Sequence, residues 1–169
     1  VNFRVINAFI PVFWTHELGT SPEQGSFALT VFFSIGIFMT YIGGLLGDKY
    51  GPIKIIRLSL LIWLPSMFLL TQVPEFSVTI MMPLAYLILL MIGAAKAISY
   101  SPVIVLGQTY LAKSIGFASG ITLGVSQTIG GIIAPVVGNL ADTYSLPSAM
   151  MTLVPFLIVG LGASLLLKD

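Results

Sequence analysis

The chain is organised around the stretch GGLLGDKYGPIKIIR, residues 43–57, which separates two long apolar runs. The stretch carries one acidic residue, Asp48, and three basic residues, Lys49, Lys54 and Arg57. Each flanking run is long enough to cross a bilayer as a helix, which takes about 20 residues. The stretch therefore predicts two transmembrane helices joined by a tight charged loop at a membrane face.

The composition of the whole chain is typical of a membrane protein. Of the 169 residues, 57% are hydrophobic and 8% are charged, whereas soluble domains carry roughly 25% charged residues. The chain has no cysteine and one histidine, so we expect no metal site. It lacks a Gly-Lys-Ser/Thr phosphate loop, a nucleophile–base–acid constellation and a basic patch for nucleic acid. We therefore expect no enzyme and no cofactor, and we expect the lipid bilayer as a partner.

Six apolar segments can be read as spanning helices. They run over about residues 1–18, 25–47, 52–73, 79–111, 115–140 and 147–167. Ser21 is placed to cap the second helix, with Pro22 at its first position. The fourth helix begins near Thr79 or Pro83, and no segment shows the alternation of a strand. The sequence predicts an all-α membrane protein with six transmembrane helices.

The basic residues fall on one side of this topology. That side holds the loop with Lys49, Lys54 and Arg57, together with Lys113 and Lys168. The other side holds His16, Glu17, Glu23, Glu75 and Asp142. Loops rich in Lys and Arg stay in the cytoplasm. We therefore expect both ends of the segment to be cytoplasmic, in a cell (inner) membrane.

A short motif recurs along the chain. GLLGDKY, residues 44–50, returns as GNLADTY, residues 138–144, and a proline follows closely in each case. Each copy ends the second helix of a three-helix unit, and two such units have opposite orientations because three is an odd number. The repeat predicts a single six-helix domain, residues 1–169, built as a 3+3 inverted repeat of about residues 1–73 and 78–169.

The stretch GLLGDKYG, residues 44–51, resembles the loop signature of the major facilitator superfamily of transporters. That signature runs Gly, any residue, Leu, a small residue, Asp, a basic residue, any residue, Gly, and then basic residues. Pro52 and Ile53 occupy the expected basic places, and Lys54 and Arg57 come slightly later. Within the superfamily the chain is most similar to the fosmidomycin-resistance group. The residues concerned are Gln108, Tyr110, Leu111, Ile115, Gly116, Ser119, Gly120, Gly124, Gly138, Leu140 and Asp142, whereas Thr109 stands where that group often has an acid.

This resemblance implies the C-terminal half of a twelve-helix transporter. The expected activity is secondary active transport of a small organic solute by alternating access, with proton-coupled efflux (antiport) favoured. The chain opens directly in apolar sequence, so we interpret its start as a cut inside a larger protein. The expected partners are the solute, protons and the N-terminal six-helix half, or a second copy of the segment by self-association. The alternatives are an uptake facilitator and a non-transporting six-helix scaffold or receptor.

The first group of candidate site residues is the charged loop. The resemblance implies that this loop is a conformational latch that closes the cytoplasmic side in the outward-facing state. Its members are Gly44, Asp48, Lys49, Gly51, Lys54 and Arg57. A carboxylate such as Asp48 is favoured near the positive N-terminus of another helix. The alternative is a solvated loop whose charges only set the topology.

The second group consists of polar residues within apolar segments. The substrate-cavity candidates are Arg4, Asn7, Lys96, Gln108 and Gln127. A central lysine costs roughly 2.5 to 3.5 kcal/mol on insertion scales, so Lys96 is expected to face a cavity and to meet an anionic group of the substrate. Alternatively Lys96 and Arg4 snorkel to the boundary, and the two glutamines make interhelical hydrogen bonds. Trp14 and His16 are expected as interfacial anchors.

The third group consists of glycines that allow helices to approach closely. The helix-interface candidates are Gly116, Gly120, Gly124 and Gly131 in the fifth helix. The second helix carries a comparable set: Gly36, Gly43, Gly44 and Gly47. Small residues promote helix packing in lipid, where no hydrophobic force drives association. We expect both helices to offer a packing face without a partner in the chain, either as static packing or as a sliding interface against the missing half.

Overall fold

The structure is a computed structural model that describes the backbone of residues 2–75, 78–112 and 114–167, and the side chains of 5–74, 80–112 and 114–167. The helices are α1 Asn2–His16, α2 Pro22–Tyr50, α3 Pro52–Gln72, α4 Val78–Tyr110, α5 Ile115–Thr143, α6 Leu146–Met151 and α7 Val154–Leu166, with a short 3-10 helix, η1, at Val73–Glu75. No strand occurs in these ranges. The all-α expectation is confirmed.

Local sequence signals explain where α2 begins and how it turns into α3. The Ser21 Oγ accepts a hydrogen bond from the Gln24 N–H at 3.4 Å, and Pro22 opens α2. This is the predicted cap. Gly51 alone separates α2 from α3, with a φ of 93°. Glycine adopts a positive φ without a steric penalty, which lets the charged loop turn in a single residue.

The fourth predicted span is confirmed, whereas the sixth differs from the expected pattern. The α4 helix runs unbroken through Pro102 for 33 residues, which at about 1.5 Å per residue is about 50 Å. The sixth predicted span is divided into α6 and α7, with Thr152 and Leu153 between them. Pro155 explains the division, because it lacks the N–H that would bond to Met151 and its ring crowds that carbonyl.

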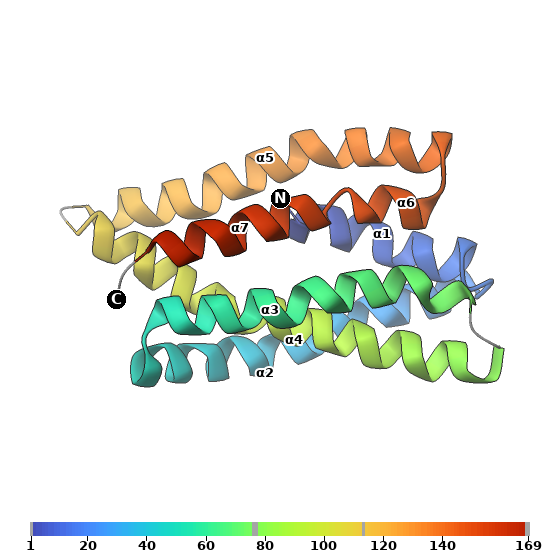
Figure 1. Ribbon diagram of the computed structural model, residues 1–169, viewed down its shortest axis with the longest axis horizontal. Helices are drawn as coiled ribbons and strands as arrows, with labels where there is room; N and C mark the ends of the chain where they lie inside the picture. Colours follow the sequence, from blue (N-terminus) through green and yellow to red (C-terminus); the bar gives the residue numbers. More distant parts are fainter. Residues whose placement is uncertain (1, 76–77, 113, 168–169) are drawn as a thin grey trace.

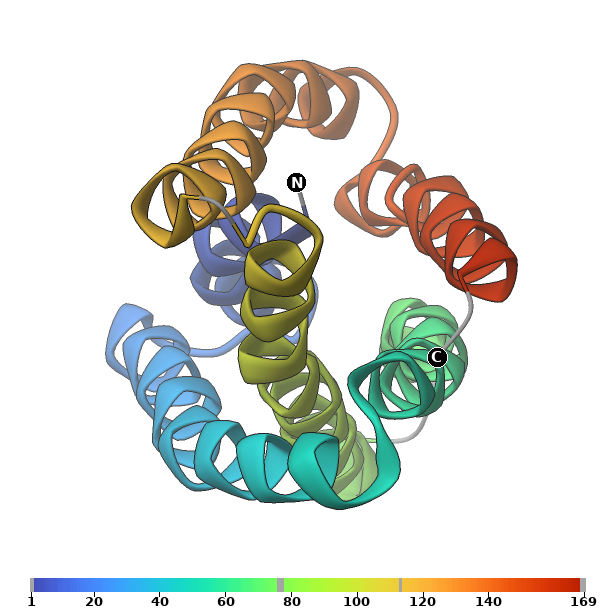
Figure 2. The same ribbon diagram turned by 90° about the vertical axis from the view of Figure 1, so that its left-hand side faces the viewer.

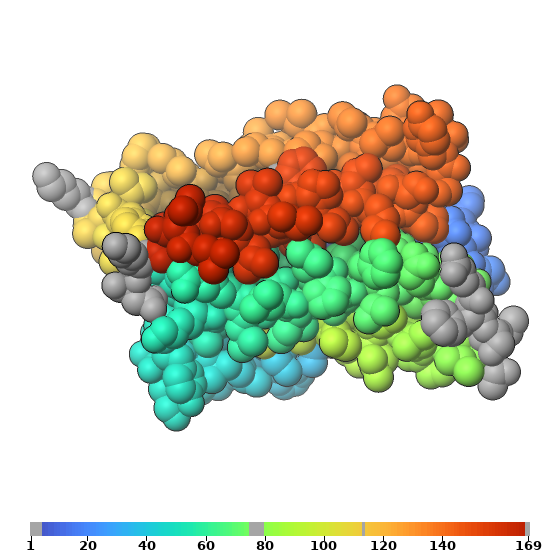
Figure 3. Space-filling model, in the orientation of Figure 1, coloured from blue at the N-terminus to red at the C-terminus, as the bar shows by residue number. Residues whose placement is uncertain are grey.

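The helices form a bundle whose members run roughly along one axis (Figure 1). Viewed end on, α4 runs through the middle of the bundle, with α2 to the left and below, α3 to the right and α5 above (Figure 2). The space-filling view shows α6 and α7 lying between α5 and α3 on one face (Figure 3). Five segments are long and apolar enough to span a membrane: 22–50, 52–72, 80–110, 115–143 and 146–166. The shorter α1 is also apolar.

Glycines bring α2 and α4 into close contact. Gly43 lies directly against the backbone of Ile98, and a Cβ on Gly47 would be 3.1 Å from the Pro102 ring. From the other side, Gly93 of α4 packs against Phe32. The expectation that the glycine face of the second helix lacks a partner in the chain is therefore wrong, because α4 covers it.

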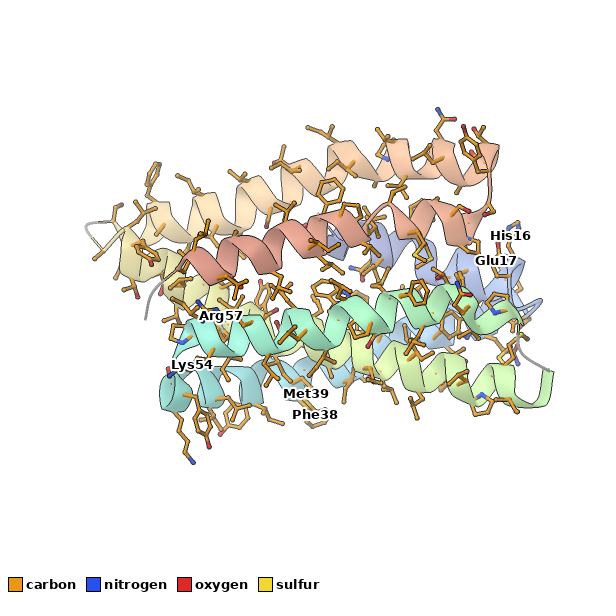
Figure 4. All side chains as sticks on the ribbon, viewed as in Figure 1. His16, Glu17, Phe38, Met39, Lys54 and Arg57 are labelled. Carbon is orange, nitrogen blue, oxygen red and sulfur yellow. The ribbon has the colours of Figure 1, made fainter. Side chains whose placement is uncertain are left out.

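The ends of the bundle differ in charge. Lys54 and Arg57 lie at one end, and His16 and Glu17 lie at the other (Figure 4). The predicted loop residue Lys113 and the tail residue Lys168 lie outside the described residues, as does the side chain of Glu75.

The expected anchors of α1 have different environments. His16 is exposed at its end of the bundle. Trp14, also expected as an interfacial anchor, is instead fully buried at 0% exposure. Its ring meets Tyr86 of α4 edge-on, with centroids 5.5 Å apart. The expectation for Trp14 is wrong because α1 packs this side chain against α4.

Candidate functional site

A cavity of about 390 Å³ lies between α3, α4, α5 and α7. Two of the predicted substrate-cavity residues, Lys96 of α4 and Gln127 of α5, both line it. They are 31 positions apart in the sequence. They line the same cavity because α4 and α5 pack side by side, with Gly107 of α4 directly against Thr122 of α5. The cavity thus gathers polar side chains within segments long enough to span a membrane.

Lys96 is half-buried and borders aromatic rings. Its Nζ lies 5.8 Å from the ring centroid of Tyr100 and 5.9 Å from that of Phe32. A cation within about 6 Å of a ring face gains electrostatic attraction from the ring. The α4 helix begins at Val78, close to the earlier of its two expected starts. The Lys96 side chain nevertheless lines the cavity.

Serine hydroxyls complete the polar wall. The Ser99 Oγ donates to the Lys96 carbonyl at 2.9 Å, and the Ser126 Oγ donates to the Leu123 carbonyl at 2.9 Å. Each hydroxyl has only one hydrogen, and in both serines a carbonyl of the same helix accepts it. Both residues line the cavity.

The other lining residues were not predicted from the sequence, among them Trp63, Tyr100 and Thr122. Tyr100 follows Lys96 by four positions, which places both on one helix face, and this spacing was a usable signal. Trp63 and Thr122 stand in apolar helices without any local mark. Only the packing of α3 and α5 against α4 brings them to the cavity.

The other cavity candidates lie elsewhere. The Gln108 Nε2 donates to the Ser119 Oγ at 2.9 Å and so joins α4 to α5, as the interhelical alternative expected. Asn7 is half-buried in α1, and its Oδ1 has no hydrogen-bond partner in the described part of the chain. The side chain of Arg4 lies outside the described residues.

The latch candidates surround the α2–α3 turn. Asp48 and Lys49 are exposed in the last turn of α2, and Lys54 is exposed in the first turn of α3. The Lys49 Nζ lies 5.1 Å from the ring of its neighbour Tyr50. Of the two glycines, Gly51 makes the turn and Gly44 faces Ser101 of α4, where an added Cβ would be 3.3 Å from the Oγ.

Arg57 differs from the rest of the loop. Its Nε and Nη2 donate to the Ser164 carbonyl at 3.0 and 2.7 Å, and Nη2 also donates to the Leu167 carbonyl at 2.8 Å. These carbonyls end α7, where a cation is favoured by the helix dipole. The structure thus uses Arg57 to cap a helix 107 positions away.

The candidate glycines of α5 face open space. A Cβ built on Gly116, Gly120, Gly124 or Gly131 would have nothing within 4 Å. Gly120 and Gly124 form the floor of a shallow apolar groove along α5, flanked by Phe117, Ile121 and Val125. This glycine face therefore has no neighbour in the described part of the chain.

Known proteins resemble this chain over most or all of its length. The model of the Major Facilitator Superfamily matches residues 1–169. The chain is 32% identical to the uncharacterized MFS-type transporter YfnC of Bacillus subtilis (strain 168) over 88% of this chain and 35% of the relative. It is 28% identical to the Fosmidomycin resistance protein of Escherichia coli (strain K12) over 83% of this chain and 33% of the relative. The chain thus spans about a third of the length of these curated relatives. No solved structure matches it.

Proposed function

Because the chain belongs to the Major Facilitator Superfamily, we propose that it is one six-helix half of a secondary transporter. That transporter moves a small organic solute across a membrane by alternating access. The two three-helix units, about residues 1–73 and 78–169, form this half, and an N-terminal half supplies the other wall of the pathway. The resemblance of the charged loop to the superfamily is confirmed by the family match.

The observation that carries this proposal is the shared cavity of Lys96 and Gln127. Polar and ionisable side chains within a bilayer are costly and mark the pathways of solutes and ions. Here both side chains converge on one space of about 390 Å³, which lies in the range of about 300 to 1,000 Å³ that small-molecule sites occupy. A scaffold that binds no solute has no need for this arrangement.

We propose efflux coupled to protons as the direction and driving force. A relative of this chain carries the printed name Fosmidomycin resistance protein, and a transporter gives resistance to a drug when it exports that drug. The basic end of the bundle, with Lys54 and Arg57, faces the cytoplasm under the positive-inside rule. Both ends of the segment then lie on the cytoplasmic side of a cell membrane.

The loop around Asp48 is proposed as the latch between the two halves. Asp48 is exposed at the end of α2, where it is accessible to a helix N-terminus of the other half. The open glycine face of α5 is proposed as a packing surface for that half, because small residues let helix backbones approach.

Inside-out membrane vesicles that contain the whole protein test the proposed activity. An acidic interior is established, and an acridine dye reports the proton gradient while fosmidomycin and a panel of small organic acids are added. Antiport predicts that a transported solute collapses the gradient in these vesicles but not in vesicles without the protein. Uptake of labelled solute without proton movement would instead support a facilitator. The absence of flux for every solute, with the protein correctly inserted, would support a scaffold.

A further inference from the structure

We propose that the cavity between α3, α4, α5 and α7 binds the acidic head of an organic monoanion that has an apolar body. This inference rests on the proposed transport function, since it names the class of solute for the same site. It concerns the chemistry of the cavity wall, which can be measured separately from flux.

The charge of the cavity wall selects the sign of the ligand. Lys96 is the one charged side chain among the described lining residues, and none of those residues is acidic. A positive charge surrounded by apolar helices is poorly screened. An anion in the cavity lowers the cost of burying Lys96, whereas a cation there raises it. One cationic side chain balances one negative charge, and this favours a monoanion.

The hydrogen-bond donors and acceptors of the cavity wall fit a solute whose acidic head has a polar group beside it. The Gln127 amide and the Thr122 hydroxyl add hydrogen-bond donors to that of Lys96. The Ser99 hydroxyl spends its hydrogen on a helix carbonyl and so offers an acceptor. A solute with a carboxylate-like head and a hydroxyl or N–H close to it satisfies both sets.

A buried indole gives a second, independent indication of a ligand. Trp63 is 8% exposed and lines the cavity. Its Nε1–H is a buried donor without a hydrogen-bond partner in the described part of the chain. Native proteins rarely leave such a donor unsatisfied. A solute that carries an acceptor into this cavity would lie beside the Trp63 ring.

The remaining wall is apolar and accommodates the body of the solute. Rings of Trp63, Tyr100 and Phe156 and aliphatic side chains such as Ile104 and Leu157 surround the polar patch. Aromatic and aliphatic walls with a few placed polar groups are typical of sites for small organic molecules. The cavity therefore suits an amphipathic acid better than a sugar or an inorganic ion.

The test places a thiol beside Lys96 in the whole protein. Ser99→Cys is nearly isosteric and lies one turn from Lys96, about 5 to 6 Å away between Cβ atoms. This chain has no other cysteine, and any thiols in the rest of the protein are replaced. The rates of modification by an anionic sulfonatoethyl and a cationic trimethylammonioethyl methanethiosulfonate are compared, each relative to its rate with a free thiol in solution.

The expected result is that the thiol reacts with the anionic reagent faster than with the cationic one, by about tenfold or more, because of the positive charge of Lys96 in apolar surroundings. Lys96→Met should abolish this preference, and the matched control Lys96→Arg should retain it. Phenylacetate should slow modification, whereas its isosteres phenylacetamide and 2-phenylethylammonium should not. The protection experiment uses the native Lys96 and stays informative if Lys96→Met does not fold.

Two outcomes would overturn the proposal. One is an equal or cation-favouring rate ratio in the protein with native Lys96. The other is protection by the amide or the ammonium compound as strong as that by phenylacetate. If solute flux were intact alongside either outcome, the anion site would be wrong while the transport function would stand.

Discussion

At the scale of single residues, Arg57 shows how one side chain acquires a role from the fold. In the sequence it belongs to a basic loop, and in the structure it is half-buried and holds the carbonyls of Ser164 and Leu167 at the end of α7. Its neighbours Lys49 and Lys54 are exposed. The same basic cluster therefore contains one residue that joins α3 to the end of α7 and others that face solvent.

We expect Arg57→Met to destabilise the protein by about 1 to 3 kcal/mol, the usual cost of losing hydrogen bonds from a charged group. The carbonyls that end α7 would lose their cap. The midpoint of thermal unfolding in detergent measures the effect. Lys49→Met removes the same charge from an exposed position and should leave the midpoint nearly unchanged. Equal midpoints for the two variants would show that the cap contributes little.

Two glycines within long apolar helices should respond differently to alanine. A Cβ at Gly43 meets the Ile98 backbone, whereas a Cβ at Gly124 meets nothing within 4 Å. Gly43→Ala should cost about 1 to 3 kcal/mol through overpacking. In this six-helix segment without the other half, Gly124→Ala should leave stability unchanged or raise it by up to about 1 kcal/mol, because alanine is the better helix former. In the whole protein the same change should be costly if the other half packs on this face. Thermal unfolding of both variants in detergent checks this, and a Gly43→Ala protein as stable as the parent would contradict the α2–α4 packing.

At the scale of helices, capping residues, prolines and glycines near helix ends indicated where some of the helices begin and end. Ser21, Pro22 and Gly51 mark the start of α2 and the turn into α3, and the structure has both there. The division of the sixth span by Pro155 was not predicted, because a proline near a helix start and a proline that splits a helix look alike in sequence. Local sequence signals also could not show that Lys96 and Gln127 line one cavity, since this depends on how α4 and α5 pack.

Asp48 lies at an electrostatically unfavourable position at the end of α2. A carboxylate in the last turn of a helix faces the negative end of its dipole, and Asp48 occupies that place. Asp48→Asn should therefore keep or slightly raise thermal stability. If the carboxylate latches the other half, the same change should slow transport by shifting the balance of conformations. Transport rate and unfolding midpoint are measured on the same preparation, and an unchanged rate would remove Asp48 from the latch.

At the scale of the whole molecule, the repeated motif and the charge distribution give the same topology. The α2–α3 turn and the α5–α6 connection lie at opposite ends of the bundle (Figure 1). The two copies of the motif end at these places, with Lys49 in one copy and Thr143 in the other. Of the two copies of the motif, only the one at the α2–α3 turn contains a basic residue. The positive-inside rule favours the cytoplasm for that end of the bundle.

Corresponding tyrosines of the two copies allow a direct test of this topology. Tyr50 and Tyr144 occupy the same motif position and are 50% and 76% exposed, and replacing either one leaves every charge in place. In intact cells, a membrane-impermeant maleimide should label Tyr144→Cys and should reach Tyr50→Cys only after permeabilisation. This chain supplies no background thiol. Labelling of both positions from outside would contradict the inverted repeat, whereas the reverse pattern would keep the repeat and invert its orientation in the membrane.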